Sequence, residues 1–263
     1  MNQEQQLFGD ADRAPVLARD RVDSDVFSLA RDLVTSRQNV SPKRLVEPGP
    51  SARDLDSLLG LAAAAPDHGL LTPWRFILVP AEQRHRLAEV FALALIDRDP
   101  GATLVQIEAA RDKAHRAPLL LVAVACLGAR EPNTPPLERM VSMGAAIQNV
   151  LLGAHAMGSG AGLTSGQAMA SERLRELLGL AEGEAPVCCI NIGTVAKRKP
   201  AARLRPAAGD ILTVLGSHSA ADQPQPQPVV QHALDGAGSA AAPIIPAAAT
   251  IAALMISSSG IAS

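Results

Sequence analysis

Residues 62–76 read AAAAPDHGLLTPWRF, and this stretch decides the fold that we expect for the chain. An alanine-rich helix must end before Pro66, because proline lacks the N–H group and clashes with the preceding turn. Asp67 and His68 then predict a polar turn, and the aromatic and β-branched residues 74–79 predict a strand. A helix end, a polar turn and a strand start therefore meet here, at the single tryptophan of the chain.

The remaining periodicities predict helices and strands around one sheet. Residues 119–126 are continuously apolar, as in a central strand covered on both faces. Residues 138–157 are apolar nearly all round, which predicts a long, buried central helix. Ser51 and Asp54 predict a capping box at a helix start. The expected elements are helices over 25–36, 51–65, 81–96, 102–115, 138–157 and 170–178 and strands over 75–79, 119–126 and 187–192. The predicted fold class is α+β, with a central mixed or antiparallel sheet flanked by helices.

Composition divides the chain into three parts. Residues 1–24 are polar and charge-dense and lack an apolar period, which predicts a flexible N-terminal extension. Residues 25–215 hold the expected elements and are predicted to form one domain. Residues 216–263 are rich in proline, alanine and glycine, and their Gln-Pro run at 223–228 favours extended polyproline geometry. We expect this last part to be a low-complexity tail outside the core.

The overall charge argues against nucleic acid as a partner. The formal net charge is −2 and the isoelectric point is near 6.3, whereas a nucleic-acid-binding protein usually presents a basic face. Basic residues such as Arg84, His85 and Arg86 alternate with nearby acids, and we interpret them as part of a solvated helix face.

The three cysteines do not suggest a disulfide framework. Cys188 and Cys189 are adjacent in an apolar run and Cys126 ends another, so we interpret all three as small buried hydrophobes in strands. Such usage is typical of a reducing compartment, and no secretory-signal pattern opens the chain. We therefore expect a cytoplasmic protein. No stretch has the roughly 18 consecutive apolar residues of a spanning helix, so no membrane association is expected.

The stretch at 62–76 resembles the nitroreductase family of FMN-dependent oxidoreductases, and its Ala-Pro-Asp-His version is similar to the branch with smaller subunits. Three further stretches resemble family elements in the same order. Residues 36–41 are similar to an Arg-Arg-Ser element. Residues 142–165 are similar to a central helix, Gly-Ala-Ala-x-Gln-Asn-Leu-Leu-Leu, and the loop after it. Residues 192–206 are similar to a late Gly-Thr followed by two basic residues.

This resemblance implies the assembly and the chemistry. It implies a homodimer with FMN at the subunit interface, hydride transfer from NAD(P)H to the flavin, and onward transfer to nitro-aromatic or quinone-like acceptors. We therefore expect an FMN-dependent NAD(P)H oxidoreductase whose partners are a small-molecule electron acceptor and a second copy of the chain. Because FMN carries the chemistry, neither a catalytic side chain nor a metal is expected.

The first cofactor-binding residues implied by the resemblance are Arg37, Gln38 and Asn39. Arg37 stands at the first arginine of the phosphate-binding element, and a planar guanidinium can bond two phosphate oxygens at once. Gln38 and Asn39 depart from the usual Arg-Ser, which removes one positive charge. Lys43 and Arg44 are candidates to replace it.

Two further positions lie around the opening stretch. The resemblance implies that His68 contacts the cofactor, because it matches the polar residue after the Ala-Pro turn. Ala64 falls where some members carry an arginine that helps to hold FMN, so that side-chain contact is missing here.

The last implied positions lie in the second half of the chain. Leu163, Thr164 and Ser165 match a loop whose backbone passes over the flavin ring. Arg203 and Arg205 match the late basic pair, and their alternation would place both side chains on one face of an extended segment.

Two alternatives remain open at this stage. One is a different reaction on the same cofactor, such as flavin fragmentation or reductive dehalogenation. The other is a non-catalytic flavin- or nucleotide-binding protein, because a fold does not fix a function. Gly158, Gly160 and Gly162 follow a helix rather than a strand, which is the wrong context for a dinucleotide fingerprint. His155 has no second metal ligand one turn away and is interpreted as a core or interface histidine.

Overall fold

A computed structural model of the chain describes residues 21–128, 133–197 and 205–215, with side chains from Asp25 onward. The chain divides into two compact units, Met1–Arg203 and Leu204–Ser263. In the second unit, the described residues include one short helix, α7 (Ala208–Ile211), which is exposed. The predicted tail, 216–263, and most of the predicted N-terminal extension lie outside the described residues.

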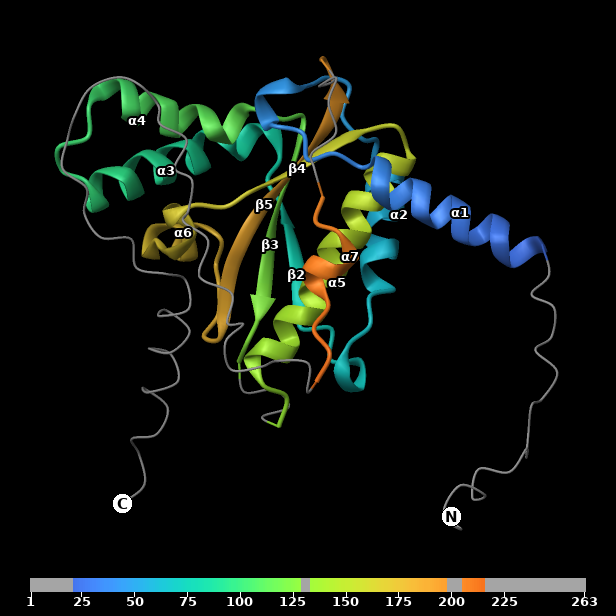
Figure 1. Cartoon of the computed structure of the whole chain (residues 1–263). Coiled ribbons are helices and arrows are strands. Elements are labelled where there is room, and N and C mark those ends of the chain that lie inside the picture. The colour runs from blue at the N-terminus through green and yellow to red at the C-terminus, as the bar shows by residue number, and fades with distance from the viewer. Residues whose placement is uncertain (1–20, 129–132, 198–204, 216–263) are drawn as a thin grey trace, which may run out of the picture. The chain divides into compact units, whose positions relative to one another are not determined.

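The first unit is built on a five-stranded sheet (Figure 1). Its main path runs β1-β5-β3-β2, and β4 pairs separately with β5. All of these strand pairings are antiparallel, which confirms the antiparallel form of the predicted sheet. The strands are β1 (Leu45–Val46), β2 (Trp74–Leu78), β3 (Leu119–Cys126), β4 (Gly160–Thr164) and β5 (Glu184–Val195).

Helices cover both faces of this sheet. Figure 1 shows α2 and α5 on one side of the strands and α3 and α6 on the other, with α4 beside α3. The helices are α1 (Arg21–Ser36), α2 (Ala52–Ala63), α3 (Arg84–Arg98), α4 (Leu104–Arg111), α5 (Pro136–Ala156) and α6 (Glu172–Leu177). The sequence correctly predicts an α+β fold with a long central helix.

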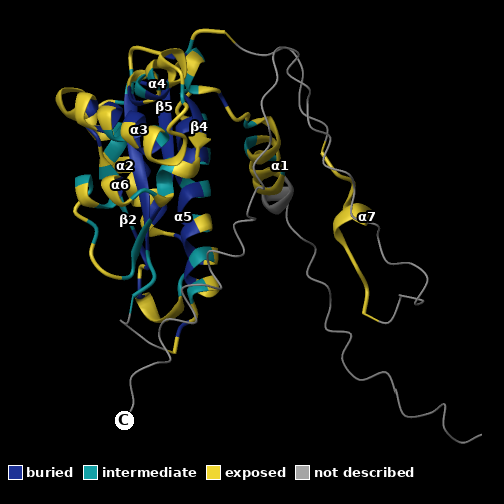
Figure 2. Cartoon of the chain, turned by 90° about the vertical axis from the view of Figure 1, so that its left-hand side faces the viewer, coloured by how far each residue is buried: buried dark blue, intermediate teal, exposed yellow. Residues whose placement is uncertain are grey.

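The central strand β3 explains why the sheet needs two covers. Successive side chains of a strand point to opposite faces. Leu121 and Ala123 accordingly pack in the core shared with α2 and α5, whereas Leu120 and Val122 pack in the core shared with α3 and α6. Residues 119–125 are all buried, and Figure 2 shows dark blue, the colour of buried residues, in the interior of the layered fold. The continuous apolar run is therefore a strand buried on both faces, as predicted.

The helix before the Ala-Pro-Asp-His turn packs closely on α5. Its start carries the predicted capping box, because the Ser51 side chain accepts from the Asp54 N–H and the Asp54 side chain accepts from the Ser51 N–H. Gly153 of α5 has no side chain at the crossing, where a Cβ would lie 2.8 Å from a methyl carbon of Leu58. The amide of Asn149 also donates to the carbonyl of Leu61 at 2.9 Å.

The structure corrects several expectations about elements. Strand β4 is not predicted from the sequence, and Leu163 and Thr164 belong to it rather than to a loop. Helix α1 begins at Arg21, inside the segment expected to be a flexible extension. Part of the helix expected over 102–115 is a 3-10 turn, Asp112–His115.

Arg84 also differs from the expectation of a solvated face. Its side chain is buried, and its guanidinium donates to the carbonyls of Val79 and Ala114 at 2.7 Å and to those of Ala117 and Pro118 at longer range. Burial lowers the pKa of this arginine. Arg84 thus ties the end of β2 to the start of β3.

The cysteines of β5 are buried and free, as predicted. Burial raises the pKa of the Cys188 thiol to about 11 and that of Cys189 to about 12. Because the thiolate is the reactive form, both side chains act as small apolar residues.

Candidate functional site

One end of α5 leads directly into the edge of the sheet. Gly158 adopts a left-handed conformation with φ 81°, its N–H donates to the His155 carbonyl at 2.9 Å, and the Ser159 N–H donates to the Ala154 carbonyl at 2.9 Å. These two hydrogen bonds form a Schellman cap. The cap reverses the chain from α5 into β4 and places His155 and Ser159 beside the strand.

The segment after α1 lies along the open edge of β4. The Val40 N–H donates to the Ala161 carbonyl at 2.9 Å, and the Asn39 Oδ1 accepts from the Leu163 N–H at 3.1 Å. This approach requires a glycine at position 162, because a Cβ there would lie 2.1 Å from the Val40 carbonyl oxygen. The structure thus brings two of the predicted groups together, residues 37–39 and residues 163–165.

A hollow of about 120 Å³ lies where α1, α5 and β4 meet. The Nε of Arg37 is buried there and has no hydrogen-bond partner among the described residues. An unsatisfied buried donor is rare in proteins and costs roughly 1–3 kcal/mol. No carboxylate lines the hollow within the described part of the chain. The lining residues are Ser36, Arg37, Gln38, Val40, Arg44, Leu151, His155, Gly158, Ser159, Gly160, Ala161 and Val195.

Two side chains in this wall are held by other parts of the chain. The Ser36 Oγ and His155 Nε2 lie 2.8 Å apart, which joins the end of α1 to the end of α5. Arg44 donates from Nη1 to the Lys197 carbonyl at 2.9 Å, which anchors it beside the end of β5. Arg44 is one of the two residues expected to compensate for Gln38, whereas Lys43 does not line the hollow.

The hydroxyl groups at the end of β4 are occupied by the sheet. Thr164 Oγ1 accepts from the buried Asn191 Nδ2 at 3.0 Å, and Ser165 Oγ donates to the Val187 carbonyl at 3.0 Å. Leu163 is exposed and its side chain has no such role. The Ser165 O–H is therefore committed to the Val187 carbonyl, whereas Thr164 only accepts from Asn191 and keeps its own O–H as a donor.

The His68 turn lies at the other end of α5. His68 Nδ1 is 2.7 Å from Glu138 Oε1 in the first turn of that helix, and both side chains are partly exposed. Leu70 and Thr72 adopt positive φ values of 57° and 46°, a conformation that costs roughly 1–3 kcal/mol for residues other than glycine. The Asp67 Oδ2 accepts a short hydrogen bond from the Thr72 N–H and holds the turn in this form.

The predicted residues therefore form two groups at opposite ends of one helix. Glu138 and His155 are 17 positions apart in α5, which at about 1.5 Å per residue places the two ends about 25 Å apart. Ala64 is the C-cap residue of α2, four positions before His68 in the sequence, and it is exposed. Arg203 lies outside the described residues, and Arg205 is exposed in the second unit.

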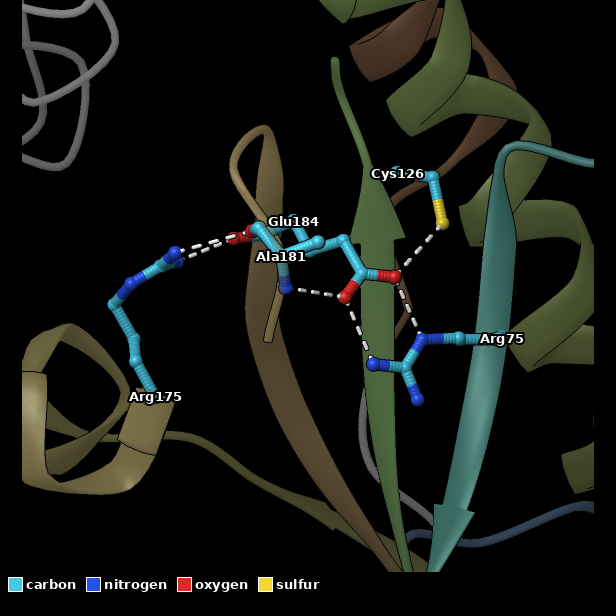
Figure 3. Close-up of polar contacts among 5 residues, drawn as sticks. All are labelled: Arg75, Cys126, Arg175, Ala181 and Glu184. Carbon is cyan, nitrogen blue, oxygen red and sulfur yellow. Dashed lines mark hydrogen bonds and ion pairs between the residues drawn. The ribbon is translucent and has the colours of Figure 1, made fainter. Parts of the chain in front are cut away.

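A second polar cluster lies near the His68 turn, at the ends of β2, β3 and β5 (Figure 3). Arg75 donates to both carboxylate oxygens of Glu184, at 2.6 and 2.8 Å. The Ala181 N–H and the Cys126 thiol also approach this carboxylate. The hydrogen bonds from Arg75 lower the pKa of Glu184 to about 2 and raise that of Arg75. Every acceptor oxygen of Glu184 is therefore already bonded within the chain.

Sequence reasoning missed the roles of Ser36, Glu138 and His155. The Ser36–His155 pair joins residues 119 positions apart and the His68–Glu138 pair joins residues 70 positions apart. No local sequence pattern predicts either pair, because each contact depends on where the two ends of α5 lie in the folded chain. The only signal in the sequence is that a histidine closes the long apolar helix.

The described residues contain neither a membrane-crossing helix nor a cluster of metal ligands. No helix among residues 21–128, 133–197 and 205–215 has the length and apolarity needed to cross a membrane. In the same part of the chain, no group of three or more histidine, cysteine, aspartate or glutamate residues could hold a metal ion.

Comparison with known families explains the arrangement of helix, turn and strand. The model of the nitroreductase family matches residues 41–194, which include the Ala-Pro-Asp-His turn, α5 and β5. The chain belongs to the nitroreductase family. It is therefore an oxidoreductase, and the family predicted from the sequence is confirmed.

Curated relatives cover most of the same region. A protein of Haemophilus influenzae named "Putative NAD(P)H nitroreductase" is 33% identical over 165 residues, which is 63% of this chain and 88% of that protein. The Escherichia coli K12 protein named "Putative NAD(P)H nitroreductase YdjA" is 32% identical over 165 residues, 63% of this chain and 87% of that protein.

Solved structures show the same fold at lower identity. A nitroreductase-like family protein from Bacillus cereus is 20% identical, with a TM-score of 0.61 over 71% of this chain and 95% of its own. The FMN-dependent nitroreductase NfnB from Mycobacterium smegmatis, in complex with NADPH, is 16% identical, with a TM-score of 0.52 over 65% of this chain and 89% of its own. Both confirm the nitroreductase-like fold.

Proposed function

We propose that this nitroreductase is an FMN-dependent NAD(P)H oxidoreductase that passes hydride from the nicotinamide to the flavin and then to a nitro-aromatic or quinone-like acceptor. The observation that carries the proposal is the buried Arg37 Nε in a hollow without carboxylates. A buried donor without a partner calls for an acceptor from outside the chain, and the phosphate of FMN is such an acceptor.

The residues present fit FMN in three respects. Arg37 and Arg44 supply positive charge for the phosphate from the wall of the hollow. Gln38 is exposed beside them and keeps two amide donors, although it lacks the charge of an arginine. Asn39 contributes indirectly, because its Oδ1 is committed to the Leu163 N–H and fixes the position of residues 163–165 along the ring.

We further propose that the binding site is completed by a second copy of the chain. A nucleotide-sized ligand needs roughly 300–1,000 Å³, so the hollow of about 120 Å³ holds only part of FMN. The His68 turn lies at the far end of α5 and cannot meet Arg37 within one chain. A homodimer in which the partner's turn reaches this hollow would unite the two groups.

The exposed face of α5 supports such a dimer. Leu137 and Val141 are 61% and 74% exposed, and Gly144 follows one turn later on the same face with open space around its Cβ position. Residues at i, i+4 and i+7 share one side of a helix. An exposed stripe of apolar and small residues on a central helix is the kind of surface that a second helix covers.

When bound, FMN supplies the two-electron chemistry. The side chains described here then have the tasks of binding and orientation. Arg37 and Arg44 would hold the phosphate. Residues 163–165 would offer their backbone to the ring, in a position fixed by the contacts of Asn39 and Asn191. His68 would present one imidazole nitrogen, because Glu138 bonds the other. Leu163, which is exposed, helps to exclude water from one side of the ring.

We also infer a cytoplasmic location. Two of the three free cysteines are buried in β5, and none of the three forms a disulfide. Proteins with free thiols suit a reducing compartment.

The test is spectroscopic and uses the full-length protein. We expect a yellow protein that bleaches anaerobically with NADPH or NADH and recovers its absorbance when a quinone or a nitro-aromatic compound is added. A protein that binds flavin but never bleaches would be the non-catalytic binder. A protein that bleaches but recovers only with halogenated substrates, or that consumes its own flavin, would carry out a different flavin reaction. A protein with no flavin affinity would contradict the proposal.

A further inference from the structure

The hollow at the end of α5 contains a histidine that the phosphate-binding element of the sequence does not include. His155 lies in the last turn of the helix, and its Nε2 is 2.8 Å from Ser36 Oγ. Ser36 immediately precedes Arg37, whose buried Nε has no partner among the described residues. All three side chains line the same hollow. The imidazole of His155 therefore lines the same hollow as the unpartnered Nε of Arg37.

The charge of the hollow explains why another cation would be useful there. Gln38 stands where the related element has its second arginine, so one positive charge is missing. The C-terminal end of a helix carries partial negative charge, and α5 ends at this hollow. An anion bound here therefore gains from positive charge beyond that of Arg37 and Arg44.

We propose that His155, oriented by Ser36, is a further phosphate-binding side chain of this site and makes the affinity for FMN depend on pH. This inference rests on the proposed function, because it requires the FMN phosphate to occupy the hollow. The shared anion chemistry is that of a phosphate monoester.

The mechanism follows from the donor rules of imidazole and hydroxyl groups. A protonated imidazole donates from both nitrogens, so Ser36 Oγ accepts from Nε2 and its own O–H is free to donate to phosphate. A neutral imidazole with an unprotonated Nε2 accepts the Ser36 O–H and withdraws that donor from the ligand. Protonation of His155 thus adds a charge and releases a hydroxyl donor at the same time.

The other ionisable groups at the site would not produce the same pH dependence of FMN affinity. Among the lining residues, the charged or titratable side chains are Arg37 and Arg44, from the segment after α1, and His155, from α5. Arginine stays protonated throughout the physiological range. The phosphate of FMN loses its second proton near about pH 6. That change is common to every variant and cancels when two variants are compared at one pH.

The experiment measures FMN and riboflavin affinity by flavin fluorescence, with the full-length chain freed of flavin, at pH 5.5 and pH 8.0. His155→Gln keeps a polar side chain that cannot be protonated in this range. We expect it to weaken FMN binding about 5- to 10-fold at pH 5.5 and about 2-fold or less at pH 8.0. Riboflavin, which lacks the phosphate, should bind the variant as it binds the wild type at both pH values.

Matched variants separate the possible failures. His85→Gln, at an exposed position of α3, should bind FMN like the wild type, and Ser36→Ala should reduce the pH dependence without abolishing binding. Equal FMN affinity of His155→Gln and wild type at pH 5.5 would overturn the inference, as would a parallel loss of riboflavin and FMN, which would make His155 a structural residue. If the wild type binds no FMN, the proposed function fails instead.

Discussion

The two ends of α5 differ in how their polar groups are satisfied. At the His68 end, Glu138 bonds the imidazole, Asp67 bonds the backbone of the strained turn, and Glu184 accepts from Arg75 and Ala181. At the Arg37 end, a buried guanidinium nitrogen has no acceptor among the described residues. One end is complete within a single chain and the other is not. Under the proposed function, most of the affinity for the ligand is expected at the Arg37 end, whereas the His68 end would supply a preformed shape.

The largest effect is expected when the Arg37 end and the His68 end of α5 are kept from meeting across the proposed dimer. Gly144→Arg places a charge on the exposed face of α5, where a Cβ meets nothing within 4 Å in the same chain. An arginine also has a higher helix propensity than glycine, so the single chain should still fold. We expect sedimentation to change from a dimer to a monomer at low micromolar concentration, with nearly complete loss of bound FMN.

Leu104→Arg is the matched control for that variant. Leu104 is 80% exposed on α4, away from the face of α5 under test, and its substitution should leave the dimer and its flavin intact. A monomeric Gly144→Arg protein that retains FMN would refute the shared site.

The next effect concerns the Arg37 end alone. Arg37→Ala removes a charge-assisted hydrogen bond to phosphate worth roughly 1.5–3 kcal/mol, which corresponds to an increase of about 10- to 150-fold in the FMN dissociation constant. Riboflavin affinity should be unchanged, since riboflavin has no phosphate. Fluorescence titration of both ligands checks this expectation, and an equal loss for both would show that Arg37 only supports the fold.

A smaller effect is expected at the His68 end. Glu138→Gln weakens the hold on the His68 imidazole, but both side chains are more than one third exposed, and such pairs are worth only about 0–1 kcal/mol. FMN and riboflavin should therefore both bind about 2- to 5-fold more weakly, because the proposed phosphate site lies at the other end of α5. A loss restricted to FMN would place His68 at the phosphate and contradict the division between the two ends.

The last effect should leave flavin affinity untouched and appear only in stability. The pKa of Glu184 is lowered to about 2 by its hydrogen bonds with Arg75. A carboxyl with a lowered pKa in the folded state stabilises the protein above its ordinary titration range and loses that contribution as the pH falls. Glu184→Gln should cost about 1–2 kcal/mol at pH 7, a value reduced because Arg75 is 40% exposed, and progressively less between pH 4.5 and pH 2.

Thermal unfolding over that pH range tests the last expectation. Glu82→Gln, an exposed carboxyl in the 3-10 turn Ala81–Gln83, is the control and should follow the wild type. A Glu184→Gln protein whose stability difference from wild type stayed constant from pH 7 to pH 2 would show that the ion pair is not responsible.

Much of the fold could be predicted from the sequence, because local chemistry and burial agree in those elements. The capping box of Ser51 and Asp54, the stop at Pro66 and the doubly buried strand at 119–126 each have a short-range cause. Strand β4 could not be predicted in this way. Its glycines resemble a helix stop followed by a loop, and their requirement arises from Val40 and Leu45, more than 100 residues earlier.

The residues of the candidate site show the same difference between features with a short-range cause and features that depend on distant parts of the chain. Arg37 and His68 can be nominated from the sequence because they lie in ordered motifs. The contacts of Glu138 and His155 cannot, because they depend on the position of α5 in space. Arg84 was misjudged because its partners are all backbone carbonyls, which leave no trace in the pattern of side chains. The roles of the predicted cofactor residues stay predictions until flavin binding is measured.

The short bridge between residues 39–40 and β4 has a consequence for the behaviour of the protein in concentrated solution. An open strand edge can pair with another molecule and start aggregation. Here the Val40 N–H donates to the Ala161 carbonyl, and the Leu163 N–H donates to the side-chain oxygen of Asn39. These two bonds replace those that a neighbouring strand would make. An amide side chain thus seals an edge that a full strand would extend. The Asn39 side chain therefore hinders a strand of a second molecule from pairing with β4.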